Sequence, residues 1–229
     1  MKVKLALKKL DYYSNEAYNT LRTNIQFCGG DKRVIEFTSC MPNEGKSSVT
    51  LNLAVSMAES GKSVLLIDAD LRKSVLKARV RLQERVDGLT HYLTGQASVE
   101  EIICTTDIPQ LHMIFAGPVP PNPSELLNSS LFEELISEQR KKYEYIIIDT
   151  PPLGSVIDSA IIARVCDGTI MVVETDAVSY KLAQEVKEQM IKTGCPILGV
   201  VLNKVDISKR SYYGKYKKYR KYKEYKNRG

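Results

Sequence analysis

Positions 39–48, Ser-Cys-Met-Pro-Asn-Glu-Gly-Lys-Ser-Ser, have the residue types and spacing of a phosphate-binding loop. They lie between a short apolar run and an amphipathic segment, so a strand is expected to lead into a helix here. Loop amide groups and the positive end of the helix favour an anion. Lys46 would then reach the β- and γ-phosphates of a nucleotide, and Ser47 would bind Mg²⁺. The residues expected around the nucleotide are Asn43, Glu44, Gly45, Lys46, Ser47 and Ser48.

One departure from the usual pattern is Cys40, which occupies the place of the first glycine of such a loop. Pro42 and Asn43 form a turn pair, and Asn tolerates the left-handed conformation that glycine normally supplies. We therefore expect Asn43 to close the loop in that conformation. An ordinary turn between a strand and a helix is the alternative that the loop alone leaves open.

Three carboxylates follow two apolar runs. The runs 64–68 and 145–149 end in Asp68 and Asp149, and Asp70 lies two residues after the first of these. A magnesium–nucleotide site needs an acid at this edge of a sheet, to bind the metal or its water molecules. A single acid in such a place is often only the cap of the next helix. Two strands, three acids and a Gly-Lys-Ser loop together favour the nucleotide site.

Short apolar runs alternate with amphipathic segments along most of the chain, which predicts an α/β fold with a doubly wound, mostly parallel sheet. An initial helix is expected over 11–27, because residues 17, 21 and 25 are apolar at four-residue spacing. Ser124 is expected to cap the helix that follows a proline-rich connector, 117–123. The predicted strands are 33–39, 63–68, 111–115, 145–149, 169–174 and 197–203, and the later helices are 46–60, 124–142, 156–166 and 179–193. Ligands should gather at the carboxyl ends of the strands.

Composition and charge divide the 229 residues into a body and a tail. Residues 208–229 hold ten Lys or Arg and one Glu, so this tail carries +9 and the other 207 residues carry −3 of the total of +6. Five cysteines without a CxxC pair argue against a disulfide framework or a zinc site. A secretory signal and a run of 18 apolar residues are both missing, so we expect a cytoplasmic protein. The predicted units are 1–30, 31–207 and 208–229.

The tail interleaves tyrosines with basic residues and contains no aliphatic residue to bury after position 208. Such a segment is expected to be disordered. Two uses are open: a substrate that enters an active site, or a basic surface that binds nucleic acid or anionic lipid. The tyrosines in question are Tyr212, Tyr213, Tyr216, Tyr219, Tyr222 and Tyr225.

Several motifs together resemble the bacterial protein-tyrosine kinases of capsule and exopolysaccharide systems, of the stand-alone CpsD/CapB type. The resemblance covers nearly the whole chain: residues 16–27, the loop 39–48, 64–73, the proline segment, Asp-Thr-Pro-Pro at 149–152, Gly-Val-Val-Leu-Asn-Lys at 199–204, and the tail. It implies a P-loop NTPase fold related to the MinD/ParA ATPases. It also implies Mg-ATP as the cofactor, catalytic roles for Lys46, Asp68, Asp70 and Asp149, and Mg²⁺ ligation by Ser47, Asp68 and Asp149.

The same resemblance implies an autophosphorylating kinase that modifies the six tail tyrosines, in trans between subunits, and that regulates capsule or exopolysaccharide synthesis. Glu16 and Arg22 would belong to an oligomerisation helix of a homo-oligomer, such as a ring, although Asn19 replaces the middle arginine of that motif. The implied partners are a membrane-embedded polysaccharide co-polymerase, or chain-length regulator, whose cytoplasmic tail activates the kinase at the inner face of the membrane, and a cognate tyrosine phosphatase. No nucleic acid is expected as a partner. A MinD/ParA-type regulatory ATPase without kinase activity is the alternative.

Two assignments stay open at this level. Either Asp68 or Asp70 is the candidate base that orients a tyrosine hydroxyl. The run 203–206, Asn-Lys-Val-Asp, reads like the guanine-recognition motif of GTPases, but a proline stands at 152, where a GTPase would have glycine. Asn203 is therefore taken as an adenine contact, as in related ATPases.

Overall fold

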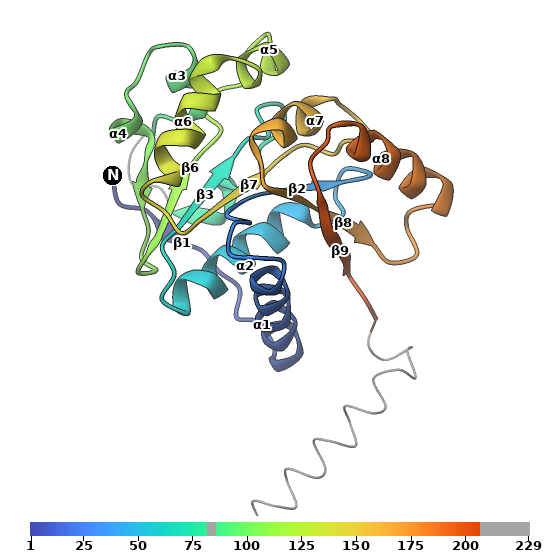
Figure 1. Cartoon of the computed structure of the whole chain (residues 1–229). Helices are drawn as coiled ribbons and strands as arrows, with labels where there is room; N and C mark the ends of the chain where they lie inside the picture. Colours follow the sequence, from blue (N-terminus) through green and yellow to red (C-terminus); the bar gives the residue numbers. More distant parts are fainter. Residues whose placement is uncertain (82–85, 207–229) are drawn as a thin grey trace, which may run out of the picture.

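The computed structural model describes residues 1–81 and 86–206. Within these residues, seven strands form one sheet in the order β5-β6-β3-β7-β2-β8-β9 (Figure 1). All neighbours run parallel except β5 and β6. The strands are β2 Val34–Ser39, β3 Val64–Asp68, β5 Cys104–Thr105, β6 Leu111–Ile114, β7 Tyr145–Asp149, β8 Gly168–Glu174 and β9 Ile197–Asn203. The predicted fold class is confirmed.

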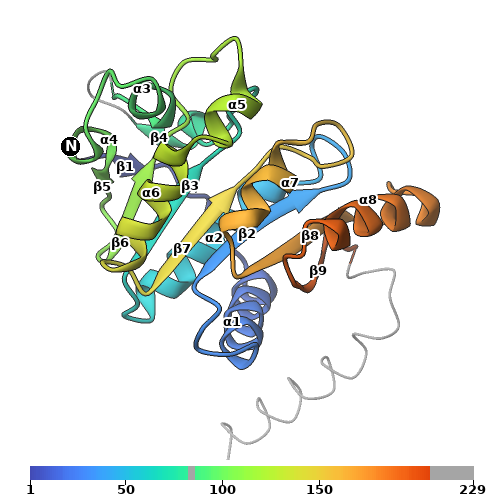
Figure 2. The same ribbon diagram turned by 45° about the horizontal axis from the view of Figure 1, so that its top comes forward.

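Helices cover both faces of the sheet (Figures 1 and 2). On one face lie α1 Tyr12–Phe27 and α2 Lys46–Glu59, which pack against each other. The other face carries the remaining helices, so that the strands are buried on both sides, as a doubly wound sheet requires. These are α5 Pro123–Leu127, α6 Ser130–Arg140, α7 Asp158–Ile162 and α8 Tyr180–Lys192, with the short α3 Leu89–Leu93 and α4 Val99–Ile102 at the β5 side.

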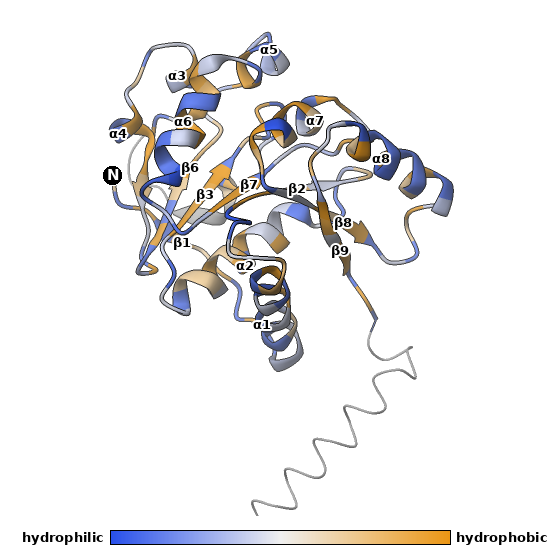
Figure 3. Cartoon of the chain, in the orientation of Figure 1, coloured by the Kyte–Doolittle hydropathy of each residue, from blue (hydrophilic) through white to orange (hydrophobic). Residues whose placement is uncertain are grey.

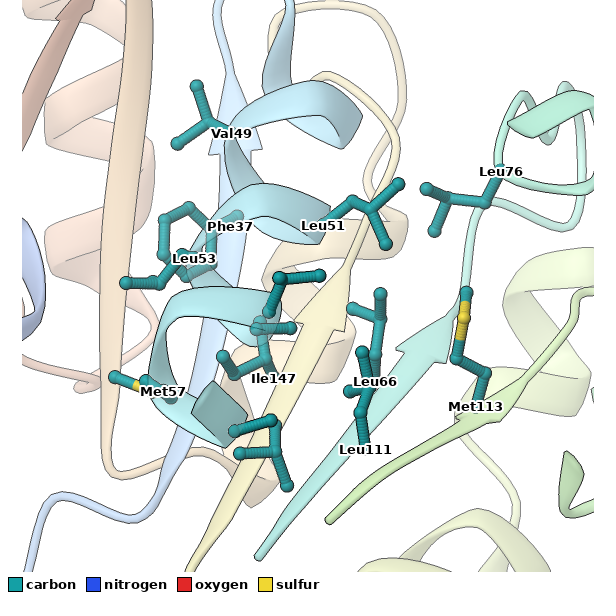
Figure 4. Packing of buried hydrophobic residues seen from close by; sticks show 14 of the residues in the cluster. Phe37, Val49, Leu51, Leu53, Met57, Leu66, Leu76, Leu111, Met113 and Ile147 are labelled. Carbon is teal, nitrogen blue, oxygen red and sulfur yellow. The ribbon is translucent and has the colours of Figure 1, made fainter. Parts of the chain in front are cut away.

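The central strands form because their residues are apolar on both faces (Figure 3). Alternate residues of one strand face opposite sides of the sheet, so Leu66 packs on the α2 side and Leu65 on the α6 side. Phe37 and Ile147 belong to the cluster under α2, where Leu53 and other residues of that helix cover them (Figure 4). This packing fixes the carboxyl ends of β2, β3 and β7 against one another.

The structure corrects two predicted helices. The segment 124–142 forms two helices, because Ser129 is extended (φ −79°, ψ 156°) at the N-cap of α6. Asn and Ser at 128 and 129 are residues that favour helix ends. The predicted cap Ser124 instead lies inside α5, behind Asn122 at the N-cap and Pro123. The segment 156–166 holds the shorter α7 and a 3₁₀ turn, η2 Ala163–Val165.

Short strands near the N-terminus escaped prediction. The strand β1 Lys4–Leu5 pairs with β4 Val80–Arg81, which follows the 3₁₀ turn η1 Lys77–Arg79. Two-residue strands carry no readable alternation. Val3, Leu5 and Ile25 are buried with the residues under α2, so the segment predicted as 1–30 packs on the main sheet.

The predicted tail, 208–229, lies outside the described residues. A search of the part of the chain that the structure describes finds no helix long and apolar enough to span a bilayer.

Candidate active site

The phosphate-binding loop joins β2 to α2 and contains two residues in the left-handed conformation. Asn43 has φ 69° and Gly45, the N-cap of α2, has φ 86°. The predicted left-handed Asn43 is thus confirmed. The loop borders a pocket of ≈ 450 Å³, which extends from the loop across the segments that follow β3 and β7. Its lining comprises Ser39, Pro42, Asn43, Glu44, Gly45, Lys46, Ser47, Ser48, Asp70, Arg72, Lys73, Val75, Pro151, Pro152, Ser155, Val156 and Lys204.

Lys46 forms a buried ion pair with the acid that ends β7. Its Nζ lies 2.5 Å from Oδ1 of Asp149, and the Oγ1 of Thr50 donates to the same oxygen at 3.3 Å. Ser47 is the neighbour of Lys46, with its Oγ 3.4 Å from Nζ. The loop lysine, the hydroxyl that is predicted to bind Mg²⁺ and one of the predicted acids therefore lie together.

Asp68 lies directly beside this pair. It is in register with Asp149 across β3 and β7, and its side chain is fully buried. Burial raises the pKa of Asp68 to about 8, and the nearby charge of Asp149 adds to the increase. The Oγ of Ser74 donates to Oδ2 of Asp68. Two buried acids thus lie beside one buried lysine, and one of them, Asp68, keeps a proton that a bound cation could replace.

The donor set fits a hard divalent cation. The hydroxyl of Ser47 and the carboxylates of Asp68 and Asp149 offer only oxygen atoms, which Mg²⁺ prefers. Among the described residues, no group of three or more His, Cys, Asp or Glu could hold a metal ion alone. A Mg²⁺ ion here would take its other ligands from nucleotide phosphates and water, which is its usual mode of binding.

Asp70 lies farther out than Asp68, on the wall of the pocket. Its Oδ1 accepts hydrogen bonds from the backbone N–H groups of Lys73, at 2.9 Å, and Arg72, at 3.3 Å. The turn that follows β3 is therefore closed on Asp70, and it brings Arg72 and Lys73 to the same pocket.

On the opposite side, the loop is tied to the ends of β8 and β9. Glu44 is buried and accepts from the N–H of Met41 at 2.7 Å and of Glu174 at 3.0 Å. The Nδ2 of Asn203 donates to the carbonyl of Glu44 at 2.8 Å. Lys204 Nζ donates to the carbonyl of Asn43 and to Glu174, each at 2.8 Å. Asn203 contacts the loop backbone, and its predicted contact with adenine stays a prediction.

Cys40, in the place of the first glycine, is buried. Burial raises the pKa of its thiol to about 11, with a further contribution from Glu44. Its side chain lies in the cluster that includes Leu153 and Met171, on the α8 side of the sheet. The thiol is thus part of the packing below the loop.

The residues predicted for oligomerisation lie on α1, apart from the residues that line the pocket. Glu16 is exposed and accepts a hydrogen bond from Asn19 at 3.4 Å. Arg22 donates from Nη1 to the carbonyl of Ser56 at 2.8 Å and to its Oγ at 3.1 Å, which binds α1 to α2. The six tail tyrosines, Tyr212 to Tyr225, lie outside the described residues.

Comparison with known proteins gives one consistent answer. A family model described as an AAA domain matches residues 33–194. Tyrosine-protein kinase CpsD of Streptococcus pneumoniae serotype 4 is 44% identical over 212 residues, which cover 92% of this chain and 93% of the relative. The chain belongs to the CpsD/CapB family of bacterial tyrosine-protein kinases. The predicted family and the predicted enzyme class are thereby confirmed.

Solved structures agree with this membership. The chimerical protein CapA2B2 is 34% identical, with a TM-score of 0.79 over 83% of this chain and 84% of that one. The septum site-determining protein MinD of Pyrococcus horikoshii, solved with Mg-ADP, is 26% identical, with a TM-score of 0.63 over 74% of this chain and 69% of that one. The CpsD/CapB chain thus has the P-loop fold that was predicted, and nucleotide binding follows from it.

Sequence reasoning did not find Asp158 or the role of Ser124, which together hold Arg72 of the pocket wall. Asp158 is fully buried at the start of α7, and Ser124 belongs to α5. The only sequence signal is that Asp158 follows soon after the Asp-Thr-Pro-Pro segment, and this does not indicate that it pairs with Arg72.

Proposed function

We propose that this CpsD/CapB kinase transfers the γ-phosphate of Mg-ATP to tyrosines of its own tail, in trans between subunits of a homo-oligomer. The observation that carries the proposal is the pairing of Lys46 with Asp149 beside the buried Asp68, at the phosphate-binding loop. In a loose transition state, charge spreads over the γ-phosphoryl oxygens, so catalysis is mainly positioning and electrostatic stabilisation. Lys46 and the loop amides are the groups that supply it.

The other residues of the site have different proposed roles, according to how deeply each side chain is buried. Ser47, Asp68 and Asp149 hold Mg²⁺, which neutralises the phosphate charge when it is bound. When the nucleotide binds, Lys46 would give up its ion pair with Asp149 and bind the phosphates instead. Asp70 lines the pocket whereas Asp68 is fully buried, so Asp70 is the acid that receives or orients the proton of the tyrosine hydroxyl.

The tail is the proposed substrate. Six phosphotyrosines, Tyr212, Tyr213, Tyr216, Tyr219, Tyr222 and Tyr225, would add roughly −9 to −12 charges. Since the tail carries +9, phosphorylation would cancel or reverse its charge. This change would weaken contacts of the tail with acidic protein surfaces or anionic lipid.

The biological setting proposed here rests on family membership. The kinase is cytoplasmic and is recruited to the inner face of the membrane by a membrane-embedded polysaccharide co-polymerase, whose cytoplasmic tail activates it. A cognate tyrosine phosphatase reverses the modification, and the cycle regulates capsule or exopolysaccharide synthesis and export. Glu16 and Arg22 contribute to the contact between subunits, for which Arg22 would exchange its bonds to Ser56.

The deciding experiment is phosphate mapping by mass spectrometry after incubation with Mg-ATP and the activator tail. Phosphate on the six tail tyrosines is expected in the parent protein and not in Lys46→Met. Lys62→Met is the matched control, because Lys62 is a partly exposed lysine paired with Glu144 outside the pocket. ATP turnover with an unmodified tail would support a regulatory ATPase of the MinD/ParA type instead.

Transfer in trans has its own test. A Lys46→Met chain with an intact tail is mixed with an active chain in which all six tail tyrosines are Phe. Phosphate on the Lys46→Met chain supports transfer between subunits. If the parent protein phosphorylates its tail but the Lys46→Met chain in this mixture gains no phosphate, transfer between subunits is contradicted.

A further inference from the structure

The turn after β3 is fastened to two distant helices through the side chain of Arg72. Its Nε donates to Oδ2 of Asp158 at 2.7 Å, and its Nη2 donates to Oδ1 at 3.0 Å. Nη2 also lies 2.9 Å from Oγ of Ser124, and that hydroxyl donates to Oδ1 of Asp158 at 2.7 Å. These three residues, which we name the Arg72 clamp, come from three separate segments of the chain.

Burial makes the geometry of the clamp specific. Asp158 is fully buried, and a buried carboxylate is costly unless charged donors satisfy it. The planar guanidinium supplies two parallel N–H groups, which fix both its distance and its orientation. In return, the bond to Asp158 raises the pKa of Arg72. Arg72 is therefore held in one place by α7, while Ser124 holds it from α5.

The clamp lies next to the residues proposed to act on the substrate. Asp70 accepts the backbone N–H groups of Arg72 and Lys73, so the backbone of the turn is fastened on one side and its side chain on the other. Asp70, Arg72 and Lys73 all line the nucleotide pocket, whereas Ser124 and Asp158 do not. A shift of Arg72 would carry Asp70 and Lys73 with it.

We propose that Asp158 and Ser124 are positioning residues, which hold Arg72 so that the turn presents Asp70 and Lys73 to the transferred phosphoryl group and its acceptor. The proposal rests on the proposed function for the role of that turn. It predicts that loss of the clamp slows phosphoryl transfer and leaves ADP binding intact, because the loop that holds ADP phosphates is tied separately by Glu44 and Asn203.

A second Arg–Asp pair offers a matched control. Arg140 Nη2 lies 2.8 Å from Oδ1 of Asp167, and the exposed fraction of the Arg140 side chain, 37%, equals that of Arg72, 38%, to within one per cent. Asp167 precedes β8 and accepts the N–H groups at the start of β2, so this pair lies at the other end of the strands. It is thus an Arg–Asp pair away from the pocket, although Asp167 is 18% exposed and Asp158 is fully buried.

The experiment compares Asp158→Asn with Asp167→Asn, and adds Ser124→Ala. ATP turnover, KM for ATP, ADP affinity, tail phosphotyrosine and the thermal midpoint are measured on the full chain. In Asp158→Asn, kcat is expected to fall about 10- to 100-fold, as for a slightly misplaced group, with ADP affinity within about twofold of the parent. Ser124→Ala should lower kcat in the same direction by about threefold, the effect of one hydrogen bond.

Asp167→Asn should lower the thermal midpoint and leave kcat unchanged. The positioning role of the clamp is refuted if Asp158→Asn folds and keeps the kcat of the parent. It is also refuted if both Asn variants lose kcat in proportion to the decrease in their thermal midpoints. Should Asp158→Asn fail to fold, Ser124→Ala decides: an unchanged kcat in that variant also refutes the clamp.

Amide hydrogen exchange separates this test from that of the kinase activity. Loss of the clamp should speed exchange at the N–H groups of Arg72 and Lys73, whether or not the parent phosphorylates its tail. A parent that hydrolyses ATP without forming phosphotyrosine would overturn the proposed function alone. Unchanged exchange at these two amides in Asp158→Asn would overturn the clamp alone.

Discussion

The phosphate-binding loop is held differently on its two sides. On the side of β9, three hydrogen bonds that involve Glu44, Asn203 and Lys204 connect it to the ends of β8 and β9. Two more bonds support them, one within the loop, from Met41 to Glu44, and one between Lys204 and Glu174. On the side of β3, one buried lysine faces two buried carboxylates, Asp68 and Asp149. The β9 side needs no further charge, whereas on the β3 side Asp68 keeps its proton up to about pH 8 unless a further cation is bound.

This difference separates support from chemistry. A set of satisfied hydrogen bonds keeps the loop in place and needs no ligand. Adjacent buried acids lower the stability of the protein, and such an arrangement is typical of functional sites. Changes on the β9 side should therefore affect nucleotide affinity and stability, and changes on the β3 side should affect the response to Mg²⁺ and the rate.

The largest effect is expected from Gly45→Ala, which forces the β9 side open. An added Cβ would lie 2.1 Å from Nδ2 of Asn203, at a residue with φ 86°. ATP turnover should fall by about 100-fold or more, as when preorganised donors are displaced, and Gly45→Ala with Asn203→Ala should recover part of it. Gly61→Ala is the control, since Gly61 has φ 90° with nothing within 4 Å of its added Cβ. Equal losses in both single variants would contradict the contact with Asn203.

The next effect tests the proton that Asp68 keeps on the β3 side. Without Mg²⁺, the free energy of unfolding should fall as pH rises from about 4 to about 8. Folded Asp68 keeps its proton up to about pH 8, but in the unfolded chain the proton leaves near 3.8. The slope from one such group is at most about 1.4 kcal/mol per pH unit, and Asp68→Asn should remove it in denaturant titrations at several pH values.

Glu36 sharpens this test because it is buried, has a pKa raised by burial to about 8, and bonds only to Thr169 and Ser159 among the described residues. Glu36→Gln should flatten the pH dependence in the same way and leave the stabilisation by Mg²⁺ unchanged. In Asp68→Asn, the stabilisation by Mg²⁺ should be lost as well. A normal response to Mg²⁺ in Asp68→Asn would remove that acid from the metal site.

A smaller effect is expected from Glu44→Gln on the β9 side. The amide can accept from only one of the two N–H groups, of Met41 and Glu174, that the carboxylate satisfies. The free energy of unfolding should drop by about 1–3 kcal/mol, and ATP should bind more weakly, as calorimetric titration would measure. Glu59→Gln, at an exposed residue at the end of α2, should change neither. An unaltered ATP affinity in Glu44→Gln would mean that the loop needs no such support.

The smallest effect should come from Lys204→Met. Lys204 is about half exposed and its pair with Glu174 is open to solvent, so the loss should be within about 1 kcal/mol and should shrink at high salt. Unfolding titrations at low and high salt measure this. A loss as large as that of Glu44→Gln would contradict the small, salt-screened role given to Lys204 and would make it a main support of the loop.

The parts of the site that consist of local sequence motifs could be predicted. The loop 39–48 and the acids Asp68 and Asp149 could be read from the sequence, because parallel strands bring their carboxyl ends to one edge. Asn43 could be assigned a left-handed conformation from its residue type. The long strands were also found, since their apolar runs are bounded by helices.

Contacts between distant segments could not be predicted. Nothing near Ser124 in the sequence indicates that its hydroxyl meets Asp158 instead of capping a helix. The bond between Glu44 and Glu174 joins a loop to a strand end 130 residues away. The strands β1 and β5 are only two residues long, so their formation depends on pairing partners and not on a local pattern.

The buried Cys40 has a practical consequence for reactivity. With a pKa of about 11, its thiol is ionised in only about one molecule in ten thousand at pH 7, and the thiolate is the form that alkylating agents and peroxides attack. Cys28, in contrast, is exposed at the end of α1. Maleimide dyes should therefore label Cys28 first, so that a reporter can be attached there while the nucleotide site stays chemically untouched and resistant to oxidants.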